Sequence, residues 1–148
     1  MPLQLERVIS GGQTGVDQTG LEVARDLGYA TGGTVPKGWT TDEGAAPWLA
    51  DYGCVESRFL GYRPRTVQNV RDADFTVWFG ERSPGYFCTI GAAIKFHKVH
   101  AIDPTVEVLQ HFLADTEIQV LNVAGNRQST HPEASVRAEA VLREALAR

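Results

Sequence analysis

Hydrophobic and polar residues alternate along the chain with two periods, and the change of period separates predicted strands from predicted helices. Short runs rich in β-branched and aromatic residues predict buried strands. They lie at residues 5–10, 29–35, 75–79, 99–102 and 118–123. Apolar residues three or four positions apart predict the helices that follow. These span residues 16–27, 65–73, 89–98, 105–114 and a C-terminal segment around 134–145.

Strands that are apolar almost throughout, alternating with amphipathic helices, are typical of a parallel sheet covered on both faces. Gly28 closes the first helix as a predicted C-cap. Residues 36–60 are predicted to be irregular, apart from one helical turn around 45–52. The pattern contains no linker, repeat or low-complexity segment. We therefore predict a single α/β domain over residues 1–148.

Composition narrows the class of protein. A hydrophobic fraction of 43% suffices for a core without disulfide or metal support. A formal charge of −4 argues against a nucleic-acid-binding chain. Cys54 and Cys88 form no C-x-x-C pair and are expected to be inert thiols in a reducing compartment. The four histidines lack the spacing of metal ligands, so no protein-ligated metal is predicted.

The N-terminal segment 1–12 lacks the apolar core of a signal peptide. No apolar run approaches the roughly 18 residues of a membrane span. We therefore expect a cytoplasmic protein without membrane attachment.

Polar or glycine-rich segments follow four of the predicted strands or strand candidates. They cover residues 9–17, 35–44, 79–89 and 122–130. In open parallel sheets, ligands bind beyond the carboxyl ends of the strands, at a topological switch point. We expect these segments to meet around one ligand.

The first of these segments, Gly11-Gly12-Gln13-Thr14-Gly15, has the features of an anion cradle. Glycines let main-chain N–H groups turn toward an anion, and the following helix adds the positive end of its dipole. Asp17 in the first turn could cap the helix or accept a hydrogen bond from a ligand hydroxyl. Tight packing alone also explains such glycines, and that alternative stays open. The cradle predicts that Gly12→Val weakens ligand binding without unfolding the chain.

Other candidates follow the later strands. Ser83, Pro84, Gly85 and Thr89 could form a second cradle near a helix start, or simply a turn with an N-cap. Gly125, Asn126 and Arg127 follow the last strand. Arg127 could bind phosphate in a bidentate manner or be an ordinary solvated arginine.

Two further groups are candidates for binding an anion. Arg65 and Asn69 share the polar face of one helix, which could line a cleft or face solvent. Lys37 and Gly38 lie in the loop after the second strand. We find no nucleophile–base pair in the sequence, which favours binding over catalysis.

Several segments together resemble one known family. They are VISGGQTGVD, PKGW, RTVQNVRDADFTVWF, SPG with Thr89, and VLNVAGNRQS. In this order they are similar to the molybdenum-cofactor carrier family, the circularly permuted branch of the SLOG superfamily. That superfamily also contains the "lonely guy" phosphoribohydrolases and the Smf DNA-processing proteins.

The resemblance implies a Rossmann-like three-layer sandwich with a mainly parallel five-stranded sheet, assembled as a dimer or tetramer. It also implies binding of molybdenum cofactor (molybdopterin) or a nucleotide-like, phosphorylated molecule. The implied ligand loops are the candidates already described: residues 11–15, 37–38, 65 with 69, 83–85 with 89, and 125–127.

The chain departs from the family pattern in two loops. Gly125-Asn126-Arg127-Gln128-Ser129 stands where G-P-R-E-S is usual, and Tyr86 and Phe87 replace small residues after Gly85. The acid of the phosphoribohydrolases has no counterpart after Thr89, where Ile90 follows. The leading hypothesis is therefore a non-catalytic carrier. The alternatives are a nucleoside-monophosphate phosphoribohydrolase using Asp17 or Asp42-Glu43, and a sensor of a nucleotide signal.

Overall fold

A computed structural model describes residues 3–148, so the first two residues of the predicted domain and N-terminal segment lie outside the described part. Six parallel strands form the central sheet in the order β5-β2-β1-β8-β6-β7. The strands are β1 Arg7–Ile9, β2 Ala30–Val35, β5 Cys54–Glu56, β6 Phe75–Phe79, β7 Val99–Ile102 and β8 Val120–Gly125. The predicted Rossmann-like, parallel α/β architecture is confirmed.

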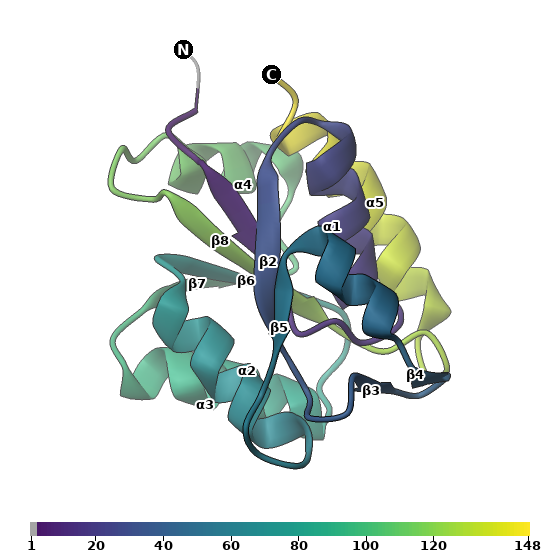
Figure 1. Cartoon of the computed structure of the whole chain (residues 1–148). Helices are drawn as coiled ribbons and strands as arrows, with labels where there is room; N and C mark the ends of the chain where they lie inside the picture. The colour runs from purple at the N-terminus through teal and green to yellow at the C-terminus, as the bar shows by residue number, and fades with distance from the viewer. Residues whose placement is uncertain (1–2) are drawn as a thin grey trace.

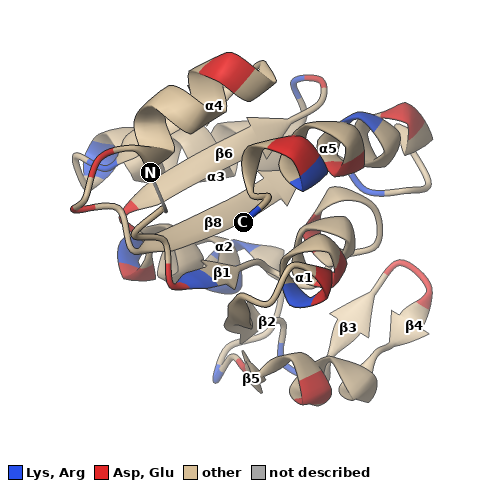
Figure 2. Cartoon of the chain, turned by 90° about the horizontal axis from the view of Figure 1, so that it is seen from above, with Lys and Arg blue, Asp and Glu red and all other residues tan. Residues whose placement is uncertain are grey.

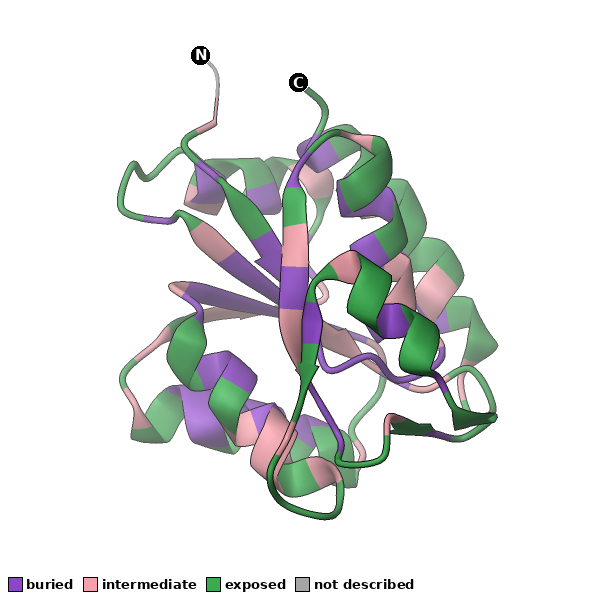
Figure 3. Cartoon of the chain, viewed as in Figure 1, coloured by how far each residue is buried: buried purple, intermediate pink, exposed green. Residues whose placement is uncertain are grey.

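Helices cover both faces of the sheet, as Figure 1 shows. The helices α1, α4 and α5 pack on one face, and α2 and α3 pack together on the other. Their bounds are α1 Val16–Asp26, α2 Tyr62–Asp72, α3 Pro84–Lys95, α4 Val106–Leu113 and α5 Pro132–Ala145. Figure 3 shows buried residues gathered on the strands and on the inner sides of the helices.

Strand β6 shows why the sheet is buried on both sides. All five residues of its sequence FTVWF are buried. Phe75, Val77 and Phe79 join the core under α1, α4 and α5, whereas Trp78 packs on the opposite face with Tyr86 and Ile90 of α3. Alternate residues of a strand point to opposite faces, so a strand buried on both faces must be apolar throughout.

The order of the strands is that of a doubly wound sheet in which the chain is circularly permuted. From β1 the chain moves outward through β2 to β5, and from β6 it moves outward to β7. Placing the unit β8–α5 before β1 would give the order 3-2-1-4-5 for the strands β2, β1, β8, β6 and β7. Both ends of the described chain lie at the same end of the molecule (Figure 1), which such a permutation requires. The switch point lies between β8 and β6.

The sheet contains one strand more than the five predicted. The additional strand, β5 Cys54–Glu56, pairs with β2 inside the segment predicted to be irregular. Three residues are too few to display a period, and edge strands gain much of their order from the neighbouring strand. The same segment also contains a hairpin, β3 Thr40–Thr41 with β4 Gly44–Ala45, and a 3₁₀ helix, Pro47–Tyr52, close to the predicted helical turn.

Two helices begin earlier than predicted. α2 starts at Tyr62 rather than residue 65, and α3 starts at Pro84 rather than residue 89. Ser83 is the N-cap of α3, since its hydroxyl oxygen accepts a hydrogen bond from the Tyr86 N–H at 3.2 Å. Proline is favoured in the first turn because its missing N–H would have no helical partner there. Thr89 consequently lies inside the helix and not at its start.

Within residues 3–148, no helix has the length and apolar character needed to cross a bilayer.

Candidate functional site

A cavity of about 520 Å³ opens beyond the carboxyl ends of β1, β8 and β6, at the switch point of the sheet. Most of the predicted site residues line it. They are Gly11, Gln13, Asp17, Arg65, Asn69, Ser83, Pro84, Gly85, Thr89, Gly125, Asn126 and Arg127. Four segments at the strand ends were predicted to meet. Residues from three of them, 9–17, 79–89 and 122–130, line the cavity, and residues 35–44 do not.

Other lining residues were not among the candidates. They are Tyr62, Arg63, Thr66, Trp78, Cys88, Asn122, Ala124, Thr130 and His131. Tyr62 and Arg63 fall before the predicted start of their helix. Trp78 and Asn122 belong to strands whose pattern indicates only core, although a polar Asn122 within an apolar strand is a signal that could have been used.

Five predicted residues do not line the cavity: Gly12, Thr14, Gly15, Lys37 and Gly38. A Cβ atom on Gly12 would lie 2.7 Å from Val35 Cγ1, and the backbone φ of Gly12 is 77°. Gly12 therefore serves packing, the alternative that the sequence left open. The Gly38 N–H donates to the Glu56 carboxylate, while Lys37 is exposed.

Gly15 allows the loops after β1 and β8 to approach each other. A Cβ atom there would lie 2.6 Å from the Asn126 main-chain oxygen, and φ is 90°. Because glycine has no Cβ atom, the two loops can come close enough for the Val16 N–H to donate to the Asn126 carbonyl at 3.3 Å. The first turn of α1 is thereby tied to the loop after β8, and both loops border the cavity.

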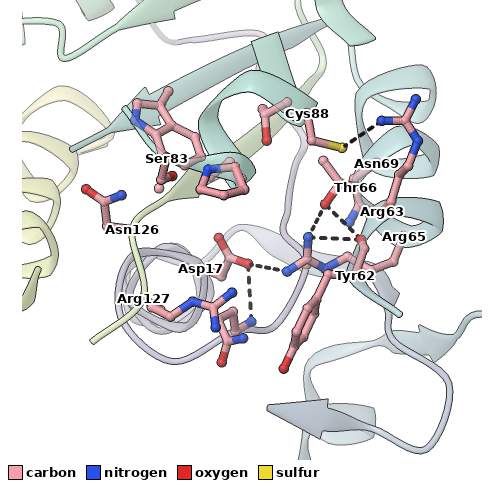
Figure 4. A pocket seen from close by; sticks show the side chains of 18 of the residues that line it. Asp17, Tyr62, Arg63, Arg65, Thr66, Asn69, Ser83, Cys88, Asn126 and Arg127 are labelled. Atoms are coloured by element: carbon pink, nitrogen blue, oxygen red, sulfur yellow. Dashed lines mark hydrogen bonds and ion pairs between the residues drawn. The ribbon is translucent and has the colours of Figure 1, made fainter. Parts of the chain in front are cut away.

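Two opposite charges, Asp17 and Arg65, lie buried in the cavity wall. Arg65 Nη2 is 3.6 Å from Asp17 Oδ2, and their side chains are only 12% and 6% exposed. Figure 4 shows the two groups pointing toward one another from α1 and α2. The Gln13 N–H also donates to Asp17 Oδ2, at 3.2 Å.

The position of Arg65 depends on its immediate neighbours. Its Nη1 donates to the Tyr62 carbonyl at 3.3 Å and to the Thr66 hydroxyl. Its Nε packs against Gly11, where a Cβ atom would come within 2.5 Å. Glycine at position 11 is therefore needed to accommodate the guanidinium.

Burial shifts the pKa values of both groups in this pair. Loss of solvation raises the pKa of Asp17 to about 6, although Arg65 and the N–H groups of Gln13 and Gly125 act in the opposite direction. Burial also lowers the pKa of Arg65, and the Asp17 charge partly restores it. The neighbouring strands β6 and β8 carry no charged residue, as Figure 2 shows. The charges of Asp17 and Arg65 are carried by the helices α1 and α2.

Three buried side-chain nitrogens in the described part of the chain have no hydrogen-bond partner: Gln13 Nε2, Arg65 Nε and Trp78 Nε1. All three belong to residues that line the cavity. The orientation of the Gln13 amide is fixed, because its oxygen accepts from the N–H groups of Thr14 and Asp42, each at 2.9 Å. Buried donors normally have partners, and an unpaired one costs about 1–3 kcal/mol.

Two asparagines among the predicted ligand residues have structural partners instead. Asn69 forms two hydrogen bonds with the main chain of Thr34, at 2.8 and 2.9 Å. Asn126 does the same with Glu81, at 2.6 and 3.1 Å. Both amides hold neighbouring segments in place around the cavity, so their role there is one of positioning.

Arg127 closes one side of the cavity. Its Nη1 lies 2.9 Å from Asp42 Oδ1, and its guanidinium carbon lies 5.3 Å from the centre of the Tyr62 ring. Arg65 lies 5.4 Å from the same ring. Tyr62 is thus in contact range of both arginines, a cation–π arrangement.

Residues 3–148 contain no group of three or more His, Cys, Asp or Glu able to hold a metal ion.

A family model described as the circularly permutated YpsA SLOG family matches residues 8–146. The chain belongs to this family. The strand order agrees with a circular permutation, since the doubly wound order is recovered when β8–α5 is moved to the front of the chain. This cpYpsA SLOG chain is also similar to a solved structure from Syntrophus aciditrophicus named "Putative molybdenum carrier protein".

The two chains are 29% identical, and the match covers 99% of this chain and 98% of the other with a TM-score of 0.86. No curated protein matches the chain. Family and structural neighbour together support a ligand-binding role.

The distances around Gly12 contradict the expectation that Gly12→Val leaves the fold intact. We expect even Gly12→Ala to lower the free energy of unfolding by about 2–4 kcal/mol, from positive φ and contact with Val35. Gly44→Ala is the matched control, since Gly44 has φ 97° but no neighbour within 4 Å of the added atom. Urea unfolding of both variants tests this, and equal losses would show that Gly12 has room for a side chain.

The pKa of Asp17 predicts a specific pH dependence of stability. Because the folded pKa of about 6 exceeds the ordinary 3.8, protonation stabilises the folded state. The contribution is complete below about pH 4 and is lost as the pH rises through 6, roughly 3 kcal/mol in total. In Asp17→Asn this loss is absent, so the stability of the variant relative to wild type should rise between pH 4 and 6. Urea unfolding across that range measures the difference, which a pH-independent result would contradict.

Proposed function

We propose that the protein binds a phosphate-bearing small molecule in this cavity, as a carrier of molybdenum cofactor or of a nucleotide-like ligand. The observation that supports this most is the position of the cavity, at the carboxyl ends of the strands and at the switch point of the sheet, where open α/β sheets bind their ligands. Arginine side chains in its wall can bind a phosphate through charged hydrogen bonds.

The charge of the wall fits an anion. Arg63, Arg65 and Arg127 line the cavity, whereas Asp17 is the single carboxylate among the lining residues. At a pKa of about 6 this carboxyl is mostly ionised at pH 7, and its pairing with Arg65 at 3.6 Å reduces its repulsion of an oxyanion. Ligand sites of small molecules have volumes of about 300–1,000 Å³, and this cavity falls within that range.

The cavity can also accept a flat ring. Trp78, Pro84 and Ala124 give part of its wall an apolar character. The name of the Syntrophus protein, together with these features, is why we place molybdenum cofactor first among phosphorylated ring compounds. The pterin of that cofactor would supply acceptors and its phosphate the negative charge, and the donors of this wall fit both.

A second candidate function is hydrolysis of the N-glycosidic bond of a nucleoside monophosphate. It is favoured by Asp17, a buried carboxyl with a pKa of about 6 inside the cavity. Asp42 and Glu43, the other carboxylates considered, are outside the lining. Asp42 is held by Arg127 and by the Ser129 hydroxyl at 2.8 Å.

Incubation with AMP followed by liquid chromatography separates the two functions. A carrier leaves AMP unchanged, and this is the expected result. Release of adenine and ribose 5-phosphate that is abolished in Asp17→Asn would establish the hydrolase instead.

The anion-binding role of Arg65 is tested by a pair of variants. Asp17→Asn removes the competing negative charge and should strengthen binding of ribose 5-phosphate. Asp17→Asn/Arg65→Met also removes the guanidinium without leaving a buried carboxylate unpaired, and should weaken binding roughly 10- to 100-fold relative to Asp17→Asn. Isothermal titration calorimetry measures both affinities.

Lys37→Met is the control, because Lys37 is exposed and lies outside the lining. It should bind as the wild type does. Wild-type dissociation constants above the millimolar range for ribose 5-phosphate, nucleotides and pterins alike would count against the proposed function.

A further inference from the structure

Asp42 connects the hairpin β3–β4 to two of the loops that border the cavity. It stands in the turn between the two strands and does not itself line the cavity. Its Oδ1 accepts from Arg127 Nη1 at 2.9 Å, and its Oδ2 accepts from the Ser129 hydroxyl at 2.8 Å. Its main-chain N–H donates to the Gln13 side-chain oxygen at 2.9 Å. The segment 35–44 therefore contacts the cavity wall without forming part of its lining.

The carboxylate of Asp42 is occupied, whereas most of the guanidinium that it holds is not. Both carboxylate oxygens accept a hydrogen bond. Among the described residues, Nη2 and Nε of Arg127 have no hydrogen-bond acceptor, and the side chain is 40% exposed. Arg127 lines the cavity, so these N–H groups are available to a ligand there. An arginine can bind an oxyanion through two parallel N–H groups.

Arg127 stands close to another cation. Its guanidinium carbon lies 5.3 Å from the centre of the Tyr62 ring, and that of Arg65 lies 5.4 Å from the same centre. Figure 4 shows both arginines and the tyrosine in the wall of the cavity. Like charges repel each other, and each arginine has a carboxylate of its own. Arg65 has Asp17 at 3.6 Å, and Arg127 has Asp42 at 2.9 Å.

Arg127 depends on its ion pair more than Arg65 does. The Arg65 side chain is 12% exposed, and Tyr62 and Thr66 also accept hydrogen bonds from it. For the exposed Arg127 side chain, Asp42 is the one acceptor among the described residues. Without this carboxylate, Arg127 would regain rotamer freedom in solvent, away from the repulsion of Arg65. A ligand would then have to order the side chain on binding, at a cost in affinity.

We propose that Asp42 is a positioning residue, which holds Arg127 beside Arg65 for binding of the anionic group of the ligand. This inference rests on the proposed function and extends the binding machinery to the hairpin β3–β4. Asp42 acts through Arg127 and does not touch the ligand.

Asp42→Ala removes the carboxylate but keeps the main-chain hydrogen bond to Gln13. We expect the affinity for ribose 5-phosphate to fall about 3- to 10-fold, because Arg127 is no longer ordered in advance. Glu43→Ala is the matched control, since it removes an equal charge from the same turn. Glu43 is exposed and outside the lining, so the affinity should not change. Isothermal titration calorimetry measures the affinities, and circular dichroism verifies that both variants are folded.

A double-mutant cycle tests whether Asp42 acts through Arg127. In the Arg127→Met background, Asp42→Ala should cause no further loss of affinity. A loss that persists in that background would overturn the inference, because the hairpin would then act by another route. Tighter binding by Asp42→Ala would also overturn it, because the carboxylate would then compete with the ligand for Arg127.

An NMR measurement on the ligand-free protein tests the positioning by itself. The Arg127 Nε–H resonance, assigned by its loss in Arg127→Met, should show a high heteronuclear NOE in the wild type and a lower one in Asp42→Ala. Equal values would overturn the inference even if ribose 5-phosphate binds, and binding would then keep the proposed function. The proposed function fails separately, if the wild type binds none of the phosphorylated ligands.

Discussion

The ion pair of Asp17 and Arg65 is the constraint on which the site depends. Removing two charges from water is costly, and their attraction offsets the cost only when the remaining hydrogen-bonding groups are also satisfied. Here Gln13, Tyr62 and Thr66 supply partners for all of the pair except Arg65 Nε, and Gly11 leaves room for the guanidinium. The pair thereby fixes α1 and α2 on opposite sides of the cavity, and any ligand that enters meets an arginine whose position is already set.

Close contacts between main-chain segments hold the loops around the cavity in position. The loops after β1 and β8 touch at Gly15 and Asn126, and Gly125 lies against Val16 of α1, with a Cβ position 2.7 Å from Val16 Cβ. Strands β1 and β8 are parallel neighbours in the sheet, so the loops that follow their carboxyl ends lie side by side. The permutation of the chain alters which strand comes first but leaves this contact intact, because it depends on neighbouring strands and not on chain order.

The sequence predicted what depends on local periodicity and missed what depends on tertiary contact. All five predicted strands were found, although β2 (ATGGTV) and β7 (VHAI) are only partly apolar. Strand β5 was missed, and it pairs with β2 at the edge of the sheet. Arg65 and Asn69 were correctly grouped on one helical face, but only the coordinates show that Asn69 binds the Thr34 backbone. Gly12 and Gly11 look alike in the sequence, yet one faces Val35 and the other faces Arg65. Trp78 was assigned to the core, since periodicity cannot show that an N–H lacks a partner.

The lining of the cavity combines one acid with several cationic groups. The lining has the carboxyl of Asp17 alone, and that carboxyl is engaged by Arg65 and Gln13. Arg63 and Arg127 add positive charge to the same wall. A wall that combines one restrained acid with three arginines suits an anionic ligand, because guanidinium groups bind phosphate through charged hydrogen bonds.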